Sequence, residues 1–284
     1  MREISLNELS LYSPWPARIL GVELWTPATK TPQEIEREYE GEKWGPLLAR
    51  YREEGGTADV ETVDRWLLGE QLLPTWIDNA IRLAPAIEAH SKYLDLVASV
   101  IGRSLPASAL VELGAGYGSA MFGVARRLSL SGQRLAGYDV TVSGPLLLGL
   151  LAERMDIAVG TGRCDFTSNQ VLPEDVPQGA VFFTSHSLMY VPRLDSHLIS
   201  QLVSLRPKAV VHFDVCYEHS NGDTLLDLMR RRYIELNDYN RNLLSLLKNA
   251  ESGGEIEILH EEAHIFGMHA LLPVSLVIWK PTQI

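Results

Sequence analysis

The feature that most constrains this chain is the alternation of short apolar segments with amphipathic segments from Ala107 onward. The short segments have the length and residue types of strands, and the longer ones keep the apolar spacing of helices. Such alternation is typical of βαβ units, which form a parallel sheet covered by helices. The predicted strands are 109–113, 134–138, 157–159, 180–184 and 209–215, and the predicted helices are 119–130, 145–155, 195–205 and 224–248.

The carboxyl-terminal part departs from this alternation. Two further strand candidates, 255–265 and 270–279, are separated by only about four residues. A connection of that length is too short for a crossover helix, so the two strands should form an antiparallel hairpin.

The first hundred or so residues have a different character. They are rich in Glu, Arg and Trp, and they contain no clear alternating strand. Segments 33–52 and 58–68 favour helices, and a further helix is expected to begin near Pro85, because proline is tolerated in a first helical turn. We therefore predict two domains: an N-terminal helical cap or substrate lid over 1–105, and a ligand-binding α/β domain over 106–284.

The composition narrows the partners and the compartment. The 284-residue chain has a net charge of −11, so we expect neither nucleic acid nor a membrane among its partners. The two cysteines, Cys164 and Cys216, are too few for a disulfide framework and suit a reducing compartment. The N-terminus lacks a secretory signal, and the apolar stretches are shorter than the about 20 residues that span a bilayer. We expect a cytoplasmic protein, and a homodimer is one arrangement that the sequence permits.

The most informative motif is Val111–Gly118, which reads Val-Glu-Leu-Gly-Ala-Gly-Tyr-Gly. A strand runs into a glycine-rich turn that opens a helix, so the backbone can approach a ligand closely and the helix presents free N–H groups. Two ligand classes compete for such a loop. A dinucleotide fingerprint is G-x-G-x-x-G, whereas the third glycine here, Gly118, comes two residues after Gly116. Asp139 ends the next strand, where it could bind a ribose diol.

Glu112–Gly118 resembles motif I of the class I S-adenosylmethionine-dependent methyltransferases, and the resemblance extends over 107–281. It implies a doubly wound, mostly parallel seven-stranded sheet with an antiparallel last strand, and S-adenosylmethionine as cofactor. In that family the glycine loop holds the amino-acid end of the cofactor, the acid after the second strand binds ribose, and residues after the third and fourth strands lie beside adenine and the methyl group. The implied cofactor-binding residues are Glu112, Gly114, Ala115, Gly116, Gly118, Asp139, Asp165, Phe166 and Ser185.

Two further patterns bear on the substrate. The segment after the fourth strand lacks the N-P-P-[YF] motif of N6-adenine and protein-glutamine methyltransferases, which argues against those substrates. More faintly, 214–218 together with 231–240 is similar to small-molecule methyltransferases of bacterial natural-product pathways, some of which act on arginine or its keto acid.

Residues just after the fourth and fifth strands are the candidates for catalysis, because ligands of open α/β sheets bind beyond the carboxyl ends of the strands. His186 is the candidate base, since an unperturbed histidine pKa of about 6.5 suits that role. Asp214 is either a substrate contact or a partner in a structural salt bridge or helix cap, and Glu218 is either a catalytic residue or a solvated loop residue. The candidate substrate-binding residues are Tyr217, His219, Glu235, Asn237, Asp238 and Tyr239, of which those in 235–242 could instead form a solvated kink between two helices.

A metal site is the weaker alternative. His260 and His264 would share one face of a strand, but positions four apart on a strand are about 13 Å apart, too far for one ion. We therefore predict no metal.

The sequence thus predicts methyl transfer to a small polar metabolite, with a cationic or guanidino amino acid as the first-choice acceptor. The alternatives are O-methylation of a sugar or polyketide, and a non-catalytic S-adenosylmethionine-binding partner protein.

Overall fold

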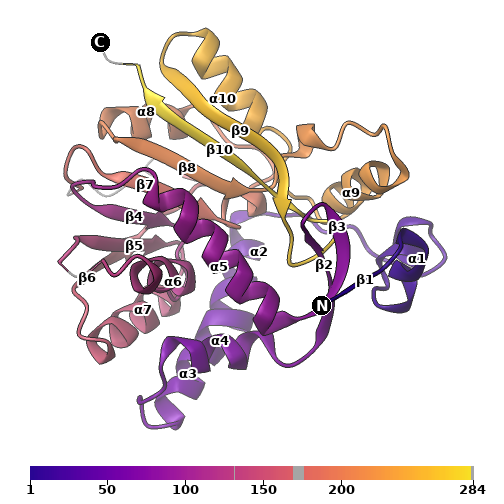
Figure 1. Ribbon diagram of the computed structural model, residues 1–284, viewed down its shortest axis with the longest axis horizontal. Helices are drawn as coiled ribbons and strands as arrows, with labels where there is room; N and C mark the ends of the chain where they lie inside the picture. Colours follow the sequence, from indigo (N-terminus) through magenta and orange to yellow (C-terminus); the bar gives the residue numbers. More distant parts are fainter. Residues whose placement is uncertain (131, 169–175, 283–284) are drawn as a thin grey trace.

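The computed structural model describes residues 1–130, 132–168 and 176–282, and its centre is one seven-stranded sheet (Figure 1). The strand order is β6-β5-β4-β7-β8-β10-β9. Strands β4 to β8 pair in parallel, and β10 runs antiparallel to both of its neighbours. The predicted doubly wound sheet with a reversed last strand is confirmed. Its strands are β4 (Leu110–Leu113), β5 (Leu135–Asp139), β6 (Val159–Arg163), β7 (Val181–Ser185), β8 (Ala209–Asp214), β9 (Ile256–Phe266) and β10 (Val274–Pro281).

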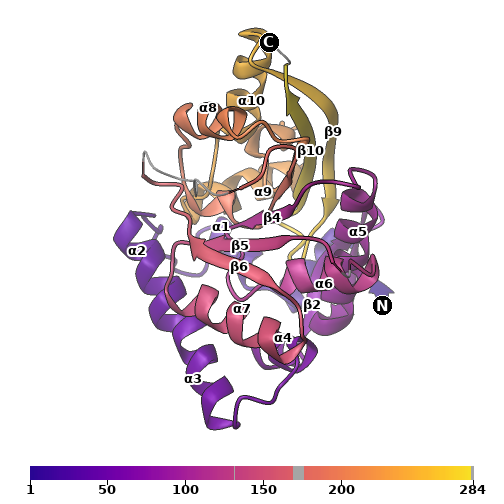
Figure 2. The same cartoon turned by 90° about the vertical axis from the view of Figure 1, so that its left-hand side faces the viewer.

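Helices cover both faces of this sheet because successive strand residues point to opposite sides. Leu110 and Val181 pack with α5 (Ala86–Gly102) and α6 (Ser119–Arg127). Their neighbours Val111 and Phe182 pack instead with α8 (His197–Ser204) and α10 (Leu243–Ser252). Figure 2 shows α5 and α6 on one side of the sheet and α8 on the other. A further helix, α7 (Ser143–Arg154), lies against β5 and β6.

The N-terminal segment contains the predicted helices. The helix expected over 33–52 is one continuous run of α2 (Pro32–Glu36), a π-helical stretch η2 (Arg37–Trp44) and α3 (Gly45–Glu53). The helix α4 (Val60–Leu68) begins after Asp59, whose carboxylate accepts the Thr62 N–H. The remaining short helices of this segment are η1 (Leu6–Leu11) and α1 (Trp15–Ile19).

The prediction that this segment contains no strand is wrong. A small sheet with the order β1-β3-β2 is formed by β1 (Arg2–Glu3), β2 (Leu72–Ile77) and β3 (Ala80–Pro85). Asp78 and Asn79, which join β2 to β3, have φ values of 53° and 57°. A two-residue hairpin turn requires two residues in the left-handed backbone conformation. The Asp-Asn pair was therefore the sequence signal that could have predicted this hairpin.

The predicted helix 224–248 is also divided. It consists of α9 (Leu225–Leu236) and α10, which are separated by residues 237–242. Asn240 in this break is fully buried, and its side chain accepts the N–H groups of Asn242 and Leu243 and donates to the carbonyl of Val191. The polar run is therefore a break that ends one helix and starts the next; Asn237 and Asn240 in it are buried, whereas Arg241 is exposed. Two further short helices, η3 (Leu188–Tyr190) and η4 (Tyr217–His219), follow β7 and β8.

Within the described residues, no helix is long and apolar enough to cross a membrane.

Candidate active site

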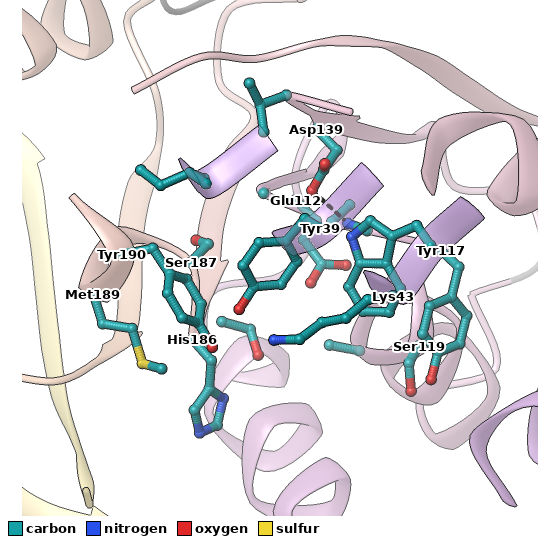
Figure 3. Close-up of a pocket in the computed structure, with 18 of the residues that line it drawn as sticks. Tyr39, Lys43, Glu112, Tyr117, Ser119, Asp139, His186, Ser187, Met189 and Tyr190 are labelled. Carbon is teal, nitrogen blue, oxygen red and sulfur yellow. Dashed lines mark hydrogen bonds between the residues drawn. The ribbon is translucent and has the colours of Figure 1, made fainter. Parts of the chain in front are cut away.

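A cavity of about 510 Å³ lies at the carboxyl ends of β4, β5 and β7 (Figure 3). This volume falls within the range of about 300–1,000 Å³ found for small-molecule sites. The segment 32–44, which we call the lid helix, forms one wall with Tyr39, Lys43 and Trp44. Asp139 and His186 lie at opposite ends of the group of side chains drawn in Figure 3.

The glycine loop forms one wall of this cavity. Gly114 and Gly116 line it, and both have positive φ values, of 77° and 52°. A Cβ atom on Gly116 would lie 2.8 Å from the Trp44 ring, and one on Gly114 would lie 2.3 Å from the Ser187 Cβ. Gly118 is the left-handed N-cap of α6 and is not among the lining residues. Only glycine therefore fits this loop, which is pressed between the lid helix and the segment after β7.

Two predicted acids hold the loop in place. Glu112 is buried, its Oε2 accepts the Met121 N–H at 3.0 Å, and burial raises the pKa of its carboxyl well above its usual value. Asp139 accepts the Gly116 N–H at 2.8 Å through Oδ2, and the N–H and hydroxyl of Thr141 through Oδ1. Burial also raises the pKa of Asp139. Both carboxyls line the cavity and fix the backbone beside it.

The other predicted cofactor residues also lie at this cavity. Ala115, Asp165, Phe166 and Ser185 all line it. The Oδ1 atom of Asp165 accepts the N–H and the hydroxyl of Thr167. The structure thus brings together every predicted cofactor residue except Gly118.

His186 lies in the cavity wall but does not have the properties of a free histidine. Its Nε2 atom is buried and, among the described residues, has no hydrogen-bond partner. Burial, with a smaller contribution from the nearby charge of His90, lowers the pKa of His186 to about 4. The ring packs edge-on against Tyr93, whose hydroxyl is bonded to Ser185 Oγ at 2.7 Å. His186 is therefore neutral at pH 7 and a weaker base than the unperturbed histidine that we expected.

The predicted catalytic residues Asp214 and Glu218 do not line this cavity. Asp214 is fully buried at the end of β8, where its Oδ1 accepts the Met189 N–H at 3.3 Å. Burial raises the pKa of Asp214 to about 7. Glu218 accepts the N–H and hydroxyl of Ser245 at the start of α10. Both acids therefore hold backbone N–H groups in place: Asp214 holds that of Met189 after β7, and Glu218 holds that of Ser245 at the start of α10.

None of the predicted substrate residues lines the cavity. His219 bonds Ser275 and Glu261, and Tyr217 donates to Glu235 at 2.8 Å. The Asn237 amide donates to the Tyr233 carbonyl. Asp238 accepts the Lys30 N–H and pairs with Arg241 at 2.7 Å, whereas Tyr239 packs edge-on against the cavity residue Tyr190.

Several residues that line the cavity were not predicted from the sequence. They are Tyr39, Lys43 and Trp44 of the lid helix, His90 and Tyr93 of α5, and Met268, His269 and Leu272 between β9 and β10. For the residues on helices, spacing was the only sequence signal that could have identified them, because the lid residues share one helical face and His90 and Tyr93 are three positions apart on α5. In the part of the chain that the structure describes, no group of three or more His, Cys, Asp or Glu residues could hold a metal ion.

Comparisons with solved structures identify similar folds. The [4+2]-cyclase SpnF is 17% identical, with a TM-score of 0.55 over 92% of this chain and 100% of that one. A geranyl diphosphate methyltransferase in complex with GPP and sinefungin is 13% identical, with a TM-score of 0.53 over 88% and 99%. Magnesium protoporphyrin IX methyltransferase from Synechocystis PCC 6803, with bound SAH, is 14% identical, with a TM-score of 0.50 over 88% and 100%.

No protein-family model and no curated protein sequence matches the chain. The structural likeness covers almost the whole length of each of these three proteins, at sequence identities that establish the fold alone. The chain therefore has the fold of the class I S-adenosylmethionine-dependent methyltransferases.

Proposed function

We propose that this protein transfers a methyl group from S-adenosylmethionine to a small molecule. The observation that carries the proposal is the glycine loop, since Gly114 and Gly116 line the cavity together with Asp139. Backbone N–H groups at the start of a helix and an acid after the next strand suit the charged amino-acid end and the ribose of such a cofactor.

The proposed cofactor fills one half of the cavity, which we call the cofactor half. Asp139 would accept one ribose hydroxyl, since a carboxylate has about four lone-pair sites and protein groups use three here, which leaves one site on Oδ2. Asp165 and Phe166 would lie beside adenine. Ser185 and His186 would lie near the methyl group, and the lid helix would exclude water. The enzyme's main task is then to align donor and acceptor for an in-line displacement.

The rest of the cavity, the acceptor half, is lined mainly by apolar side chains. Its residues are Leu67, Leu68, His90, Tyr93, Ser119, His186, Met189, Met268, His269 and Leu272. The arginine-like acceptor was inferred from acids at positions 214, 218, 235 and 238, and none of these residues lines the cavity. The lining cations Lys43 and Arg163 are already paired, with Glu38 at 2.9 Å and with Asp165 at 3.5 Å. We therefore propose an uncharged acceptor with a large apolar part and a hydroxyl group, as in O-methylation of a polyketide.

Two measurements test this proposal. Calorimetry with S-adenosylmethionine and with S-adenosylhomocysteine should show binding of both, and weaker or no binding of nicotinamide dinucleotides. Formation of S-adenosylhomocysteine should then be followed over a panel of phenols, polyketides, sugars, arginine and its keto acid. The proposal predicts turnover of phenols or polyketides above that of arginine.

The alternatives give different results. Cofactor binding without turnover of any acceptor would favour a non-catalytic binding protein, and one similar fold is indeed named for a cyclase. Fastest turnover of arginine or its keto acid would restore the first-choice acceptor and contradict the apolar one. A cytoplasmic location and a homodimer stay predictions.

A further inference from the structure

Three helices bring a histidine, a serine and an aspartate together in the wall of the acceptor half. His90 of α5 and Ser119 of α6 line the cavity, and Asp64 of α4 lies behind them with 3% of its surface exposed. His90 Nε2 is 2.9 Å from Ser119 Oγ and 3.6 Å from Asp64 Oδ2. No residue of this group belongs to the glycine motif or to the segment after β7.

The hydrogen bonds fix which nitrogen of His90 carries the proton. The Ser119 and Tyr117 hydroxyls both donate to Asp64 Oδ1, at 2.8 and 2.7 Å, and Figure 3 shows these two hydroxyl groups close together. Because the Ser119 proton points to Asp64, Ser119 Oγ accepts the Nε2–H of His90. The lone pair of His90 is then on Nδ1, for which the described part of the chain supplies no hydrogen-bond donor. A carboxylate behind an imidazole both orients the ring and stabilises its protonated form.

The other two cavity histidines lack such support. Both ring nitrogens of His269 are already bonded, Nδ1 to the Leu271 N–H and Nε2 to Ser13 Oγ. His186 Nε2 is buried without a partner, and no carboxylate is bonded to its ring within the described residues. A proton on His186 would be an unpaired buried charge, which is costly. Of these three rings, His90 is the one that is built to receive a proton.

We propose that His90 is the general base that removes the proton of the acceptor's hydroxyl group, and that Asp64 and Ser119 position it. This inference rests on the proposed methyl transfer. The acceptor oxygen forms a bond to the methyl carbon as the carbon–sulfur bond breaks, and that electron pair stays on sulfur. The hydroxyl proton passes to His90 Nδ1, and the imidazolium is stabilised by Asp64 until it releases the proton to water. Such a base is needed only when the acceptor's hydroxyl group is too weakly acidic to ionise by itself, so we expect an acceptor of that kind.

The test uses phenols of graded acidity, from 4-nitrophenol to unsubstituted phenol, as acceptors for the full-length protein. General acid–base catalysis contributes about 10²–10⁴-fold, so His90→Gln should lower kcat for unsubstituted phenol by about 10²-fold or more. The loss should be much smaller for 4-nitrophenol, which is largely ionised and needs no base. Raising the pH should narrow the difference between the variant and the wild type.

Two further variants separate chemistry from structure. His260→Gln is the matched control, because His260 also forms a pair with a carboxylate, Glu262, but on exposed strand β9. It should retain wild-type kcat for every phenol. Asp64→Asn keeps the acceptor atom for Ser119 but removes the charge, so its kcat for phenol should lie between those of the two histidine variants. Calorimetry should give all three the wild-type affinity for S-adenosylhomocysteine.

Three outcomes would overturn the role of His90. One is a structural role, shown if His90→Gln lowers kcat equally for every phenol or if its loss of kcat accompanies a lowered melting temperature. Another is unchanged turnover of unsubstituted phenol. The third is a wild-type protein that methylates arginine or a sugar but no phenol, which refutes this inference and leaves methyl transfer standing. Failure of the proposed function would look different, because the wild type would then either not bind S-adenosylhomocysteine or methylate no acceptor of any class.

Discussion

The two halves of the cavity are built in different ways. The cofactor half comes from short contiguous segments at the ends of neighbouring strands, and its carboxylates are bonded to nearby backbone N–H groups. The acceptor half comes from α4, α5, the start of α6, the segment after β7 and the loop between β9 and β10. It contains a buried histidine nitrogen without a partner among the described residues. Backbone geometry thus determines the first half, and side chains brought from distant segments determine the second.

This difference has a consequence for mutational sensitivity. In the cofactor half a substitution alters backbone shape, and binding should be lost as a whole. In the acceptor half a substitution removes one side chain from a mostly apolar wall, so it should change rate or preference. Four predictions follow this order, from the largest expected effect to the smallest.

The largest effect is expected from Gly116→Ala. The added Cβ lies 2.8 Å from Trp44 at a φ of 52°, so both the lid helix and the backbone must shift. Such strain costs about 1–3 kcal/mol before any ligand contact is lost, so the affinity for S-adenosylhomocysteine should fall by about 100-fold or more. Calorimetry measures it. Gly149→Ala, which meets nothing within 4 Å, is the matched control and should bind normally.

The second effect concerns Asp139→Asn. The new amide would place an N–H group against either the Gly116 N–H or the Thr141 N–H, and the charge that would hold ribose is lost. Hydrogen bonds to charged groups contribute about 1.5–3 kcal/mol, so the affinity for S-adenosylhomocysteine should fall about 10- to 100-fold. An unchanged dissociation constant would place the ribose elsewhere and weaken the contrast between the halves.

The third prediction tests the acceptor half through pH. The folded-state pKa of His186 is lowered to about 4, so His186 destabilises the protein as the pH falls from about 6.5 to 4, when the unfolded chain takes up the proton first. His186→Gln should therefore lose less stability over that window, by about 3 kcal/mol at most. Denaturant unfolding at several pH values measures the effect. Its pH–rate profile should match that of the wild type, and loss of the acidic limb, where a required base becomes protonated, would instead identify His186 as the base.

The smallest effect is expected from Glu235→Gln. Glu235 accepts the Tyr217 hydroxyl outside the cavity and is not a lining residue. Substitutions away from a site usually change free energies by about 0.5 kcal/mol or less, so the KM values of cofactor and acceptor should change about twofold at most. A large rise in the KM of a cationic acceptor alone would return Glu235 to the substrate site and contradict the division proposed here.

Much of the fold was predictable because local patterns agree with the tertiary arrangement. The strand that ends at Leu113 and the helix that begins at Ser119 could be placed from apolar spacing alone. The hairpin of β2 and β3 was missed because Pro74 and the short alternating stretch obscured its period, although Asp78 and Asn79 provide its turn. The break between α9 and α10 was visible as a polar run, but only packing shows that Asn240 is buried in it.

The sequence by itself determined the glycine loop, because a contiguous motif such as Gly114–Gly118 carries its own backbone geometry. It did not determine the acceptor half, since whether a polar side chain reaches a cavity depends on how distant segments pack. Asp214 ends β8 and Glu235 lies on α9, yet Asp214 bonds the Met189 N–H and Glu235 bonds the Tyr217 hydroxyl. Asp64, His90 and Ser119 lie on three helices and meet only in the folded chain. Sequence spacing fixes neighbours within an element, and only tertiary packing decides which elements face one another.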